Sequence, residues 1–315
     1  MSRPLISIVI PVFNEELNIE PCYKAVRAAL QPLDLQYAFE FVFTDNHSAD
    51  ATWPLLKKLG ASDPNVRAIR FSRNFGYQRS ILAGYLAARG AAVIQLDCDL
   101  QDPPDLIPKF LELWQAGNKV VYGVRASRKE AWHINLARKF FYRTINYLSE
   151  EKIPLDAGDF RLVDRCLIEE LRIYRDANPY LRGTIATMGF TQAEVIYHRQ
   201  QRERGESKFS LGALVSLAVD GVLNHSIVPL RVASFIGIFA SLGTLLGILV
   251  YVIGKNFFGQ QWPAGFATTT ILILSSICLN ALFLGIIGEY LGRIYKQVKF
   301  NTVVIREETI NLDLA

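Results

Sequence analysis

Short apolar runs alternate with segments of helical periodicity over the first part of the chain. The apolar runs predict β-strands at residues 5–10, 39–43, 66–71 and 92–96. The segments between them predict helices after Asn14, over residues 51–59 and over residues 78–88. Strands and helices in this order predict an α/β fold with a mostly parallel sheet and helices on both faces.

Two later segments are long and apolar enough to cross a membrane. They cover residues 232–253, which hold no charge, and residues 266–291, whose only charge is Glu289 near the far end. About 20 apolar residues span the hydrocarbon core of a bilayer, so we expect a two-helix transmembrane hairpin. The alternative, two buried helices of a soluble protein, explains neither the length of these segments nor the charges beside them.

The flanking charges predict the orientation of this hairpin. Arg231 precedes the first segment, and the second is followed by Arg293, Lys296, Lys299 and Arg306. The loop between them, residues 254–265, holds Lys255 as its only charge. By the positive-inside rule both flanks are cytoplasmic and the loop is outside. The short polar start, residues 1–4, lacks the pattern of a signal peptide, which agrees with an N-terminal domain on the cytoplasmic side.

These patterns divide the chain into four parts. We expect a cytoplasmic domain over residues 1–209, a juxtamembrane amphipathic helix over 210–230, the hairpin over 231–292 and a cytoplasmic tail over 293–315. Basic and aromatic side chains over residues 133–148 predict another interfacial helix, with an ordinary domain helix as the alternative. Two GxxxG pairs, Gly243 with Gly247 and Gly288 with Gly292, leave a homo-oligomer open.

Composition and missing motifs exclude several classes of protein. A formal net charge of +4 is too mild to argue for a nucleic-acid partner. The four cysteines, Cys22, Cys98, Cys166 and Cys278, form no CxxC pair, so neither a zinc site nor a disulfide framework is indicated. No GxGxxG or GxxxxGK[ST] loop follows the first strand, which disfavours a dinucleotide oxidoreductase and a P-loop ATPase.

Polar segments follow three of the predicted strands, at residues 11–16, 44–50 and 97–104. Ligands of parallel sheets bind at the carboxyl ends of the strands. In the first segment, Asn14 is a candidate helix cap, with Glu15 and Glu16 in the first turn of the helix. Each segment alone could be an ordinary polar turn. Three on one edge of the sheet indicate a binding site.

Asp97 and Asp99 are the sharpest feature of this edge. Two carboxylates separated by one residue, at the end of an apolar strand, can face one cation. Mg²⁺ prefers oxygen ligands and is often held by one or two carboxylates together with substrate phosphates. A solvated acidic turn is the alternative. The pair therefore predicts a divalent cation that neutralises a diphosphate leaving group.

At these residues the chain resembles the family 2 glycosyltransferases of GT-A fold, and within them the polyprenyl-phosphate glycosyltransferases. That group includes bactoprenol glucosyltransferases and dolichol-phosphate mannose synthases. The resemblance rests on five motifs, at residues 11–16, 73–76 (Arg-Asn-Phe-Gly), 97–103 (Asp-Cys-Asp-Leu-Gln-Asp-Pro), 158–162 (Gly-Asp-Phe-Arg-Leu) and 205–209 (Gly-Glu-Ser-Lys-Phe). It implies that residues 1–209 form a Rossmann-like GT-A catalytic domain and that the protein lies in a bacterial-type cytoplasmic membrane.

The resemblance also implies roles for single residues. The nucleotide would be bound by Pro11, Phe13, Glu15, Asp45 and Arg73. Mg²⁺ or Mn²⁺ would be held by Asp99, with Asp97 and Gln101 nearby. Asp159 and Arg161 would lie on the active-site floor, near the sugar and the phosphates. One departure stands out: His47 follows Asp45-Asn46, where the family has glycine. Histidine tolerates a left-handed backbone better than most residues, so the turn can survive.

The expected reaction is attack by a lipid phosphate oxygen on the anomeric carbon of a nucleotide diphosphosugar, in one inverting displacement as the family implies. The phosphate is already ionised near neutral pH, so the site must chiefly align two anions and stabilise the leaving group. Candidate phosphate-binding side chains are Arg125, Arg128, Arg202 and Lys208. Asp159 either positions the acceptor or stabilises positive charge on the sugar.

Glucose from UDP-glucose is the first expectation for the donor, with undecaprenyl phosphate as the acceptor, because the motifs resemble bactoprenol glucosyltransferases. UDP-aminoarabinose and GDP-mannose remain open. A processive polysaccharide synthase is disfavoured, because the chain has no Gln-x-x-Arg-Trp motif and two spans do not readily form a channel. A nucleotide-sugar-binding membrane protein without catalysis is the other alternative, and the acidic motifs speak against it.

Overall fold

The structure is a computed structural model. It describes residues 3–125, 157–173, 179–198, 265–299 and 304–312, together with the single positions 235–237, 239, 242, 243, 246 and 253. The chain divides into two compact units, one built around a β-sheet and one that contains the long helix α10 (Phe266–Lys299). The predicted helices at 133–148 and 210–230 lie outside the described residues.

The first unit contains an eight-stranded mixed sheet in the order β7-β5-β6-β4-β1-β2-β3-β8. The four strands at its centre are parallel: β1 (Leu5–Val12), β2 (Ala38–Asp45), β3 (Val66–Phe71) and β4 (Ala92–Gln95). On one side β6 (Ala157–Asp164) runs antiparallel between β4 and β5 (Val120–Arg125), and β7 (Gln192–Tyr197) lies parallel to β5. The predicted α/β fold with a mostly parallel sheet is confirmed.

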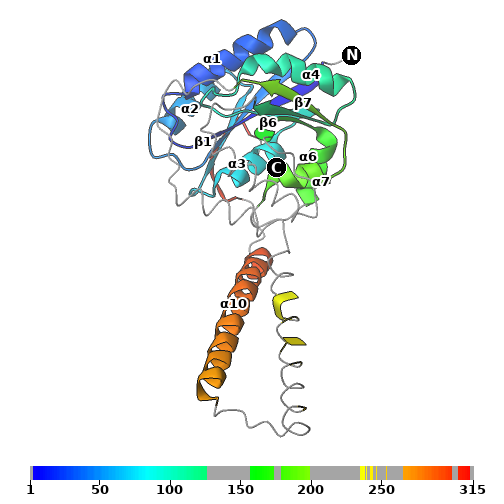
Figure 1. The fold of residues 1–315 in the computed structure, drawn as a ribbon. Helices are drawn as coiled ribbons and strands as arrows, with labels where there is room; N and C mark the ends of the chain where they lie inside the picture. Colours follow the sequence, from blue (N-terminus) through cyan, green and yellow to red (C-terminus); the bar gives the residue numbers. More distant parts are fainter. Residues whose placement is uncertain are drawn as a thin grey trace. The chain divides into compact units, whose positions relative to one another are not determined.

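Helices follow the first three parallel strands as the sequence predicts, and three helices that it did not predict come later in the chain. Together they are α1 (Ile19–Leu30), α2 (Thr52–Ser62), α3 (Tyr77–Ala87), α4 (Ile107–Gln115), α6 (Arg165–Ile173) and α7 (Leu181–Thr187). Single turns of 3₁₀ helix lie at Gln31–Leu33 and Pro104–Leu106. Figure 1 shows the helices on both faces of the sheet.

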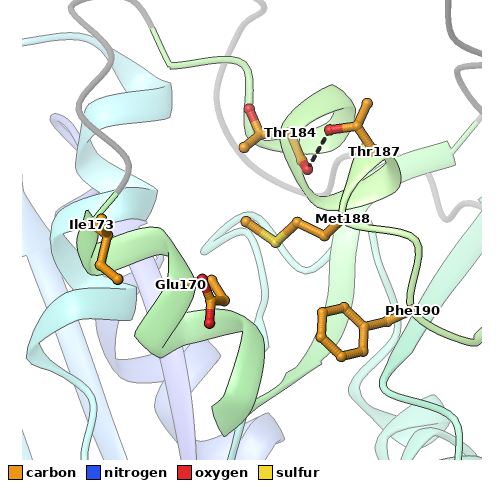
Figure 2. A pocket seen from close by; sticks show the side chains of 6 residues that line it. All are labelled: Glu170, Ile173, Thr184, Thr187, Met188 and Phe190. Carbon is orange, nitrogen blue, oxygen red and sulfur yellow. Dashed lines mark hydrogen bonds between the residues drawn. The ribbon is translucent and has the colours of Figure 1, made fainter.

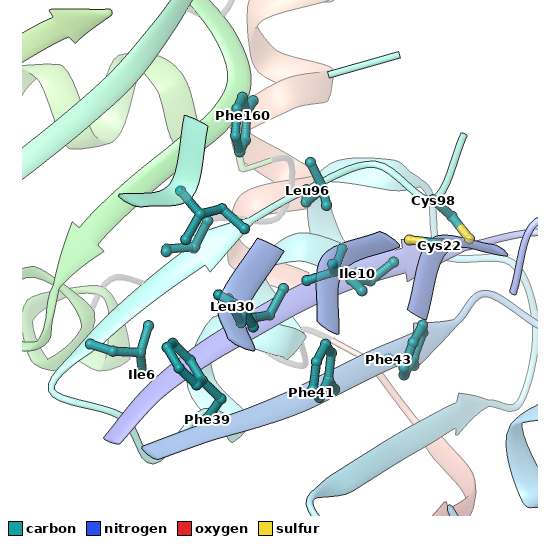
Figure 3. Packing of buried hydrophobic residues seen from close by; sticks show 14 of the residues in the cluster. Ile6, Ile10, Cys22, Leu30, Phe39, Phe41, Phe43, Leu96, Cys98 and Phe160 are labelled. Atoms are coloured by element: carbon teal, nitrogen blue, oxygen red, sulfur yellow. The ribbon is translucent and has the colours of Figure 1, made fainter. Parts of the chain in front are cut away.

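Alternate side chains along each strand point to opposite faces of the sheet, and each face packs against its own set of helices. On β1, Ile6, Ile8 and Ile10 pack with α1, α2 and α4, while Val9 between them packs with α3, α6 and α7. This is the period of two that a strand imposes on its side chains. Aromatic rings of β2 belong to the first face, where Phe39, Phe41 and Phe43 follow one another along the strand (Figure 3). Glycine allows the closest approach on the other face, because a Cβ at Gly84 would lie 2.3 Å from Val9 Cγ1.

A buried ionic network ties the amino-terminal half of the central strands. Glu40 of β2 is 1% exposed and accepts hydrogen bonds from Ser7, from the Arg67 guanidinium and from the backbone and side chain of Arg89. Burial opposes its ionisation, but these hydrogen bonds and the two guanidinium charges together lower the pKa of Glu40. The network lies away from the carboxyl ends of the strands, so it serves the fold.

The far edge of the sheet is formed by the C-terminal part of the chain. β8 (Arg306–Ile310) runs antiparallel beside β3. Glu308 accepts a hydrogen bond from Trp53 Nε1 at 2.9 Å and pairs with Lys57 at 2.6 Å. The Asn311 side-chain amide donates to the carbonyls of Gly60 and Val66, at 2.8 Å each. The region expected from the sequence to be only a tail therefore contributes a strand to the sheet.

The second unit contains α10, a helix of 34 residues that includes the second predicted span. In the part of the chain that the structure describes, it is the one helix long and apolar enough to cross a membrane. The window Ser275–Gly292 has a mean hydropathy of 1.4 and no buried residue. Of the first predicted span, 232–253, only single positions are described, so that span stays a prediction.

Candidate active site

The carboxyl ends of the parallel strands form one rim. The register pairs Val12 with Asp45 and Val9 with Gln95, so the segments after β1, β2 and β4 leave the sheet at the same edge. β6 adds to this rim because it runs in the opposite direction, with Arg161 opposite Gln95. The start of β6, including Asp159, therefore lies beside the end of β4. The predicted gathering of three polar segments is confirmed.

The loops after β1 and β2 are tied to each other. Asn14 has a left-handed backbone (φ 53°), its N–H donates to Ser48 Oγ, and its Oδ1 accepts from the Ala49 N–H, each at 2.8 Å. The Glu15 N–H donates to Thr52 Oγ1 at 2.9 Å. The expectation that Asn14 caps the first helix is wrong, because α1 begins later, at Ile19. Asn14 instead fixes one loop to the next.

The predicted nucleotide-binding residues of the first loop lie in different environments. Pro11 is buried within β1, whereas the ring of Phe13 is 38% exposed at the edge. Glu15 accepts a hydrogen bond from Asn18 Nδ2 at 2.5 Å. Phe13 is thus the member of this loop best placed to pack against a ligand, and the nucleoside-binding role of all three stays a prediction.

Asp45 is fully buried at the end of β2. Its Oδ1 accepts hydrogen bonds from the Ser48 N–H at 3.0 Å and from Ser48 Oγ at 2.5 Å. Its Oδ2 has no hydrogen-bond partner, and Arg70 Nε lies 3.8 Å away. Burial raises the pKa of Asp45, and the bonds from Ser48 and the charge of Arg70 oppose that rise only in part. A buried carboxylate oxygen without a donor is costly, so Oδ2 is suited to receive one from a ligand.

Asp97 lies at the centre of an acidic cluster after β4. Its Oδ1 accepts hydrogen bonds from the Tyr77 hydroxyl and, at 3.0 Å, from Gln95 Nε2. Burial raises the pKa of Asp97 to about 7, although the bond from Tyr77 lowers it. The negative charges of Asp159, Asp102 and Asp99 raise it further. Three further carboxylates therefore lie within electrostatic range of Asp97.

The turn after Asp97 carries the other predicted metal ligands. Asp99 Oδ1 accepts a hydrogen bond from the backbone N–H of Gln101 at 3.1 Å, and Leu100 between them has a positive φ of 56°. A left-handed backbone is uncommon for leucine, and such strain often marks a functional turn. The turn holds Asp99 and Gln101 close together.

Asp159 is held by a residue that the sequence did not single out. Arg182, from α7, donates from Nε to Asp159 Oδ1 and from Nη2 to Oδ2, both at 2.9 Å. A bidentate pair of this kind fixes the carboxylate in orientation as well as position. Arg161 is only 4% exposed and donates to the Gly158 carbonyl at 2.9 Å, so it braces the backbone next to Asp159.

The predicted phosphate-binding residues are only partly described. Arg125, at the end of β5, lies 3.7 Å from Asp102 Oδ2 and bonds to the Tyr197 hydroxyl at 3.4 Å. Arg73, predicted to bind the nucleotide, is exposed and lies over the Phe75 ring at 4.2 Å. Arg128, Arg202 and Lys208 lie outside the described residues, and their roles stay predictions.

The structure adds three side chains to the predicted site: Tyr77, Gln95 and Arg182. Tyr77 directly follows the Arg-Asn-Phe-Gly motif, and Gln95 is the one polar residue of β4, so both had a local signal. Arg182 had none, because its role depends on how α7 packs against β6.

The cluster fits a divalent cation by the chemistry of its donors. Among the described residues, no three His, Cys, Asp or Glu side chains are arranged to hold a metal by themselves. Mg²⁺ needs only one or two carboxylates when substrate phosphates complete its shell. Asp97, Asp99 and Gln101 could supply that smaller set, and a cation would relieve the repulsion among the four carboxylates.

A separate hollow lies between α6 and α7 (Figure 2). Thr187 Oγ1 donates to the Thr184 carbonyl at 2.9 Å within it. Its lining is mostly apolar and contains none of the predicted site residues: Glu170, Ile173, Thr184, Thr187, Met188 and Phe190. The hollow is therefore distinct from the acidic cluster.

The fold is an α/β fold of GT-A-like architecture. A glucosyl-3-phosphoglycerate synthase of Mycobacterium tuberculosis superposes with a TM-score of 0.50 at 19% sequence identity, over 70% of this chain and 79% of that one. This likeness concerns the fold alone. It agrees with the mixed sheet described above.

Sequence comparison assigns the family. The glycosyl transferase family 2 pattern matches residues 7–172, and the chain belongs to this family. An uncharacterized glycosyltransferase of Bacillus subtilis (strain 168), YkcC, is 37% identical over 99% of this chain and 97% of its own length. The SfII prophage-derived bactoprenol glucosyl transferase of Shigella flexneri is 38% identical over 93% of this chain and 94% of its own. The protein is a glycosyltransferase related to the bactoprenol glucosyl transferases.

Proposed function

We propose that the protein transfers glucose from UDP-glucose to a polyprenyl phosphate, undecaprenyl phosphate, at the cytoplasmic face of a bacterial-type cytoplasmic membrane. The observation that carries the proposal is the acidic cluster around Asp97, beside an Arg182-bound Asp159, at the carboxyl edge of the sheet. The near full-length similarity to a bactoprenol glucosyl transferase supports the acceptor and the sugar.

The reaction is a single inverting displacement. A phosphate oxygen of the lipid forms a bond to the anomeric carbon, the bond from that carbon to the diphosphate oxygen breaks, and the nucleoside diphosphate leaves with the electron pair. No proton has to be removed from the nucleophile, because a phosphate monoester is ionised near neutral pH. The site must therefore align two anions and stabilise the leaving group.

Asp97, Asp99 and Gln101 would hold Mg²⁺ or Mn²⁺, which when bound neutralises charge on the diphosphate. Tyr77 and Gln95 both donate to Asp97 Oδ1 and so fix the orientation of that carboxylate. Burial and the charge of Asp97 raise the pKa of Tyr77, so its hydroxyl remains a proton donor. These two residues thus prepare the cation site.

Asp159 acts through its charge and its position. Both of its oxygens accept hydrogen bonds from Arg182, which fixes the orientation of the carboxylate. It can stabilise positive charge that develops on the sugar ring while Arg182 keeps it in place. Arg161 stabilises the backbone next to Asp159 by donating a hydrogen bond to the Gly158 carbonyl.

The proposed membrane attachment rests on α10. Its apolar side chains are exposed, for example Leu272 at 65%, Leu284 at 68% and Leu291 at 62%. A helix of 34 residues is about 50 Å long, more than the hydrocarbon core requires. A Cβ at Gly237 would lie 3.6 Å from Phe283 Cε2, an ordinary packing distance that supports a hairpin of the two predicted spans.

A donor panel tests this proposal. The full-length protein in detergent is incubated with undecaprenyl phosphate, Mg²⁺ and radiolabelled UDP-glucose, UDP-aminoarabinose or GDP-mannose, and the lipid phase is counted. We expect label from UDP-glucose and none after EDTA treatment. Label from another donor would correct the sugar. Donor binding without lipid label from any donor would overturn the proposed reaction.

A further inference from the structure

A second charged cluster lies near the carboxyl ends of β2 and β3, where β8 forms the edge of the sheet. It consists of Asp45, His47, Arg70 and Glu307, which we call the Arg70 cluster. Arg70 Nε lies 3.3 Å from Glu307 Oε2 and 3.8 Å from Asp45 Oδ2. Glu307 belongs to β8, so the C-terminal part of the chain reaches the loop that follows β2.

Arg70 is shared between the two carboxylates. Its Nη2 donates to the Ser48 carbonyl at 3.2 Å, which fixes the guanidinium against the loop. Its Nε is buried and makes no hydrogen bond, although an acidic side chain lies on either side of it. Asp45 Oδ2 is likewise buried and without a partner. The position of Arg70 between two negative charges keeps it from closing fully on Asp45.

His47 joins the same cluster. Its backbone is left-handed (φ 64°), and its Nδ1 lies 2.9 Å from the Phe71 carbonyl and 3.2 Å from Glu307 Oε2. The glycine that the family resemblance implies at this position would have no side chain to make these contacts. The departure from the family pattern therefore connects the loop after β2 to β8.

We propose that Glu307 is a positioning residue for the donor nucleotide. By competing for Arg70 it keeps Asp45 Oδ2 available to an N–H of the base. The inference rests on the proposed function, with Asp45 in its predicted role of binding the donor nucleotide. In this proposal β8, which follows α10 in the chain, lines the nucleotide-binding site through Glu307.

The neighbouring Glu308 provides a matched control. It lies on the same strand and pairs with Trp53 and Lys57, while its charge acts on Arg70 only as a weaker, longer-range interaction. Replacing Glu308 should weaken the attachment of β8 to α2 but leave the ion pair between Arg70 and Glu307 in place. Both glutamates are partly exposed, at 43% and 44% of the side chain, so an isosteric change to glutamine at either leaves the core intact.

The test is calorimetric titration of UDP, with Mg²⁺ present, into the full-length protein in detergent, for wild type, Glu307→Gln and Glu308→Gln. We expect Glu307→Gln to raise the Kd of UDP about fivefold or more, since Arg70 then closes on Asp45. KM for the donor should rise in parallel while kcat stays unchanged. Glu308→Gln should stay within about twofold of wild type.

A second pair of variants, Arg70→Gln alone and combined with Glu307→Gln, separates the positioning of Arg70 from the attachment of β8. In an Arg70→Gln background, Glu307→Gln should change the Kd of UDP no further, because the group it acts through is gone. The inference is overturned if Glu307→Gln stays within about twofold of wild type, or if Glu308→Gln weakens UDP binding as much. A wild-type protein that binds neither UDP nor GDP would instead contradict the proposed function.

Discussion

Asp159 illustrates how a site residue depends on a partner distant in the sequence. The Gly-Asp-Phe-Arg-Leu motif indicates Asp159 and Arg161, but the residue that holds the carboxylate is Arg182, on a helix after β6. Local sequence cannot reveal such a contact, because it arises only when α7 packs on the sheet. Tyr77 and Gln95 lie next to recognisable motifs and were within reach of sequence reasoning.

At this scale Arg182→Lys is the most informative substitution. A lysine keeps the charge but cannot make two parallel hydrogen bonds, so Asp159 loses its fixed orientation. We expect kcat for lipid glycosylation to fall about 10²-fold, the effect of a small misplacement in a site that depends on alignment. Arg172→Lys, on the exposed face of α6, is the control and should keep wild-type activity. Unchanged turnover by Arg182→Lys would show that Asp159 needs no such clamp.

Tyr77→Phe tests the cation site without touching a proposed ligand. It removes one of the donors that orient Asp97 and leaves the ring in place. Outer-shell hydrogen bonds of this kind affect metal affinity by about 10- to 100-fold. We expect the Mg²⁺ concentration for half-maximal activity to rise about tenfold. Tyr23→Phe, whose hydroxyl bonds to Asp63 instead, should leave the Mg²⁺ requirement unchanged. An identical requirement in both variants would argue against a metal at Asp97.

At the scale of elements, the sequence predicted the centre of the sheet and not its edges. The strands at 5–10, 39–43, 66–71 and 92–96 correspond to β1, β2, β3 and β4, because continuous apolar runs mark strands buried on both faces. β8 has the sequence Arg-Glu-Glu-Thr-Ile, which carries no such signal. Its stability comes from contacts of Glu308 with Trp53 and Lys57 of α2, and from the bond of Asn311, just beyond the strand, to the Gly60 carbonyl of α2.

The buried Glu40 network predicts a pH-dependent contribution to stability. The pKa of Glu40 is lowered in the folded state, so its contribution is present above the ordinary carboxyl pKa and is lost as the pH falls through the folded-state pKa. Glu40→Gln leaves Arg67 buried without its counter-charge and should cost about 3–5 kcal/mol at neutral pH.

Thermal melting of the full-length protein, followed by tryptophan fluorescence, checks this prediction. The difference in Tm between wild type and Glu40→Gln should be large at pH 7 and should narrow in acid. Glu112→Gln, which removes an exposed pair with Lys109, should shift Tm little at either pH. A Glu40→Gln difference that grows in acid would contradict the sign given above.

At the scale of the whole molecule, the chain combines a mixed α/β sheet with a long apolar helix, α10. By length and composition α10 is long and apolar enough to cross a membrane, which is consistent with the membrane location proposed above. Hydropathy predicted this helix from the sequence because its length and composition are sufficient to mark a span. The C-terminal strand, by contrast, became apparent only in the folded sheet.

The proposed topology can be tested by thiol labelling of intact cells. Gly259→Cys lies in the segment predicted to be outside, and Leu35→Cys lies in the sheet-containing unit, where residue 35 is 90% exposed. A membrane-impermeant maleimide should label Gly259→Cys in intact cells, and should label Leu35→Cys only after the cells are opened. Labelling of Leu35→Cys in intact cells would place the catalytic unit on the other side of the membrane.

The most direct test of the central claim is the rate of sugar transfer to undecaprenyl phosphate by wild type, Asp99→Asn and Asp105→Asn. Asp105 is an exposed carboxylate just beyond the acidic turn and serves as the matched control. If the turn after β4 is the catalytic centre, Asp99→Asn should lower kcat by about 10²-fold or more, while Asp105→Asn transfers at the wild-type rate. Equal rates for wild type and Asp99→Asn would contradict the account.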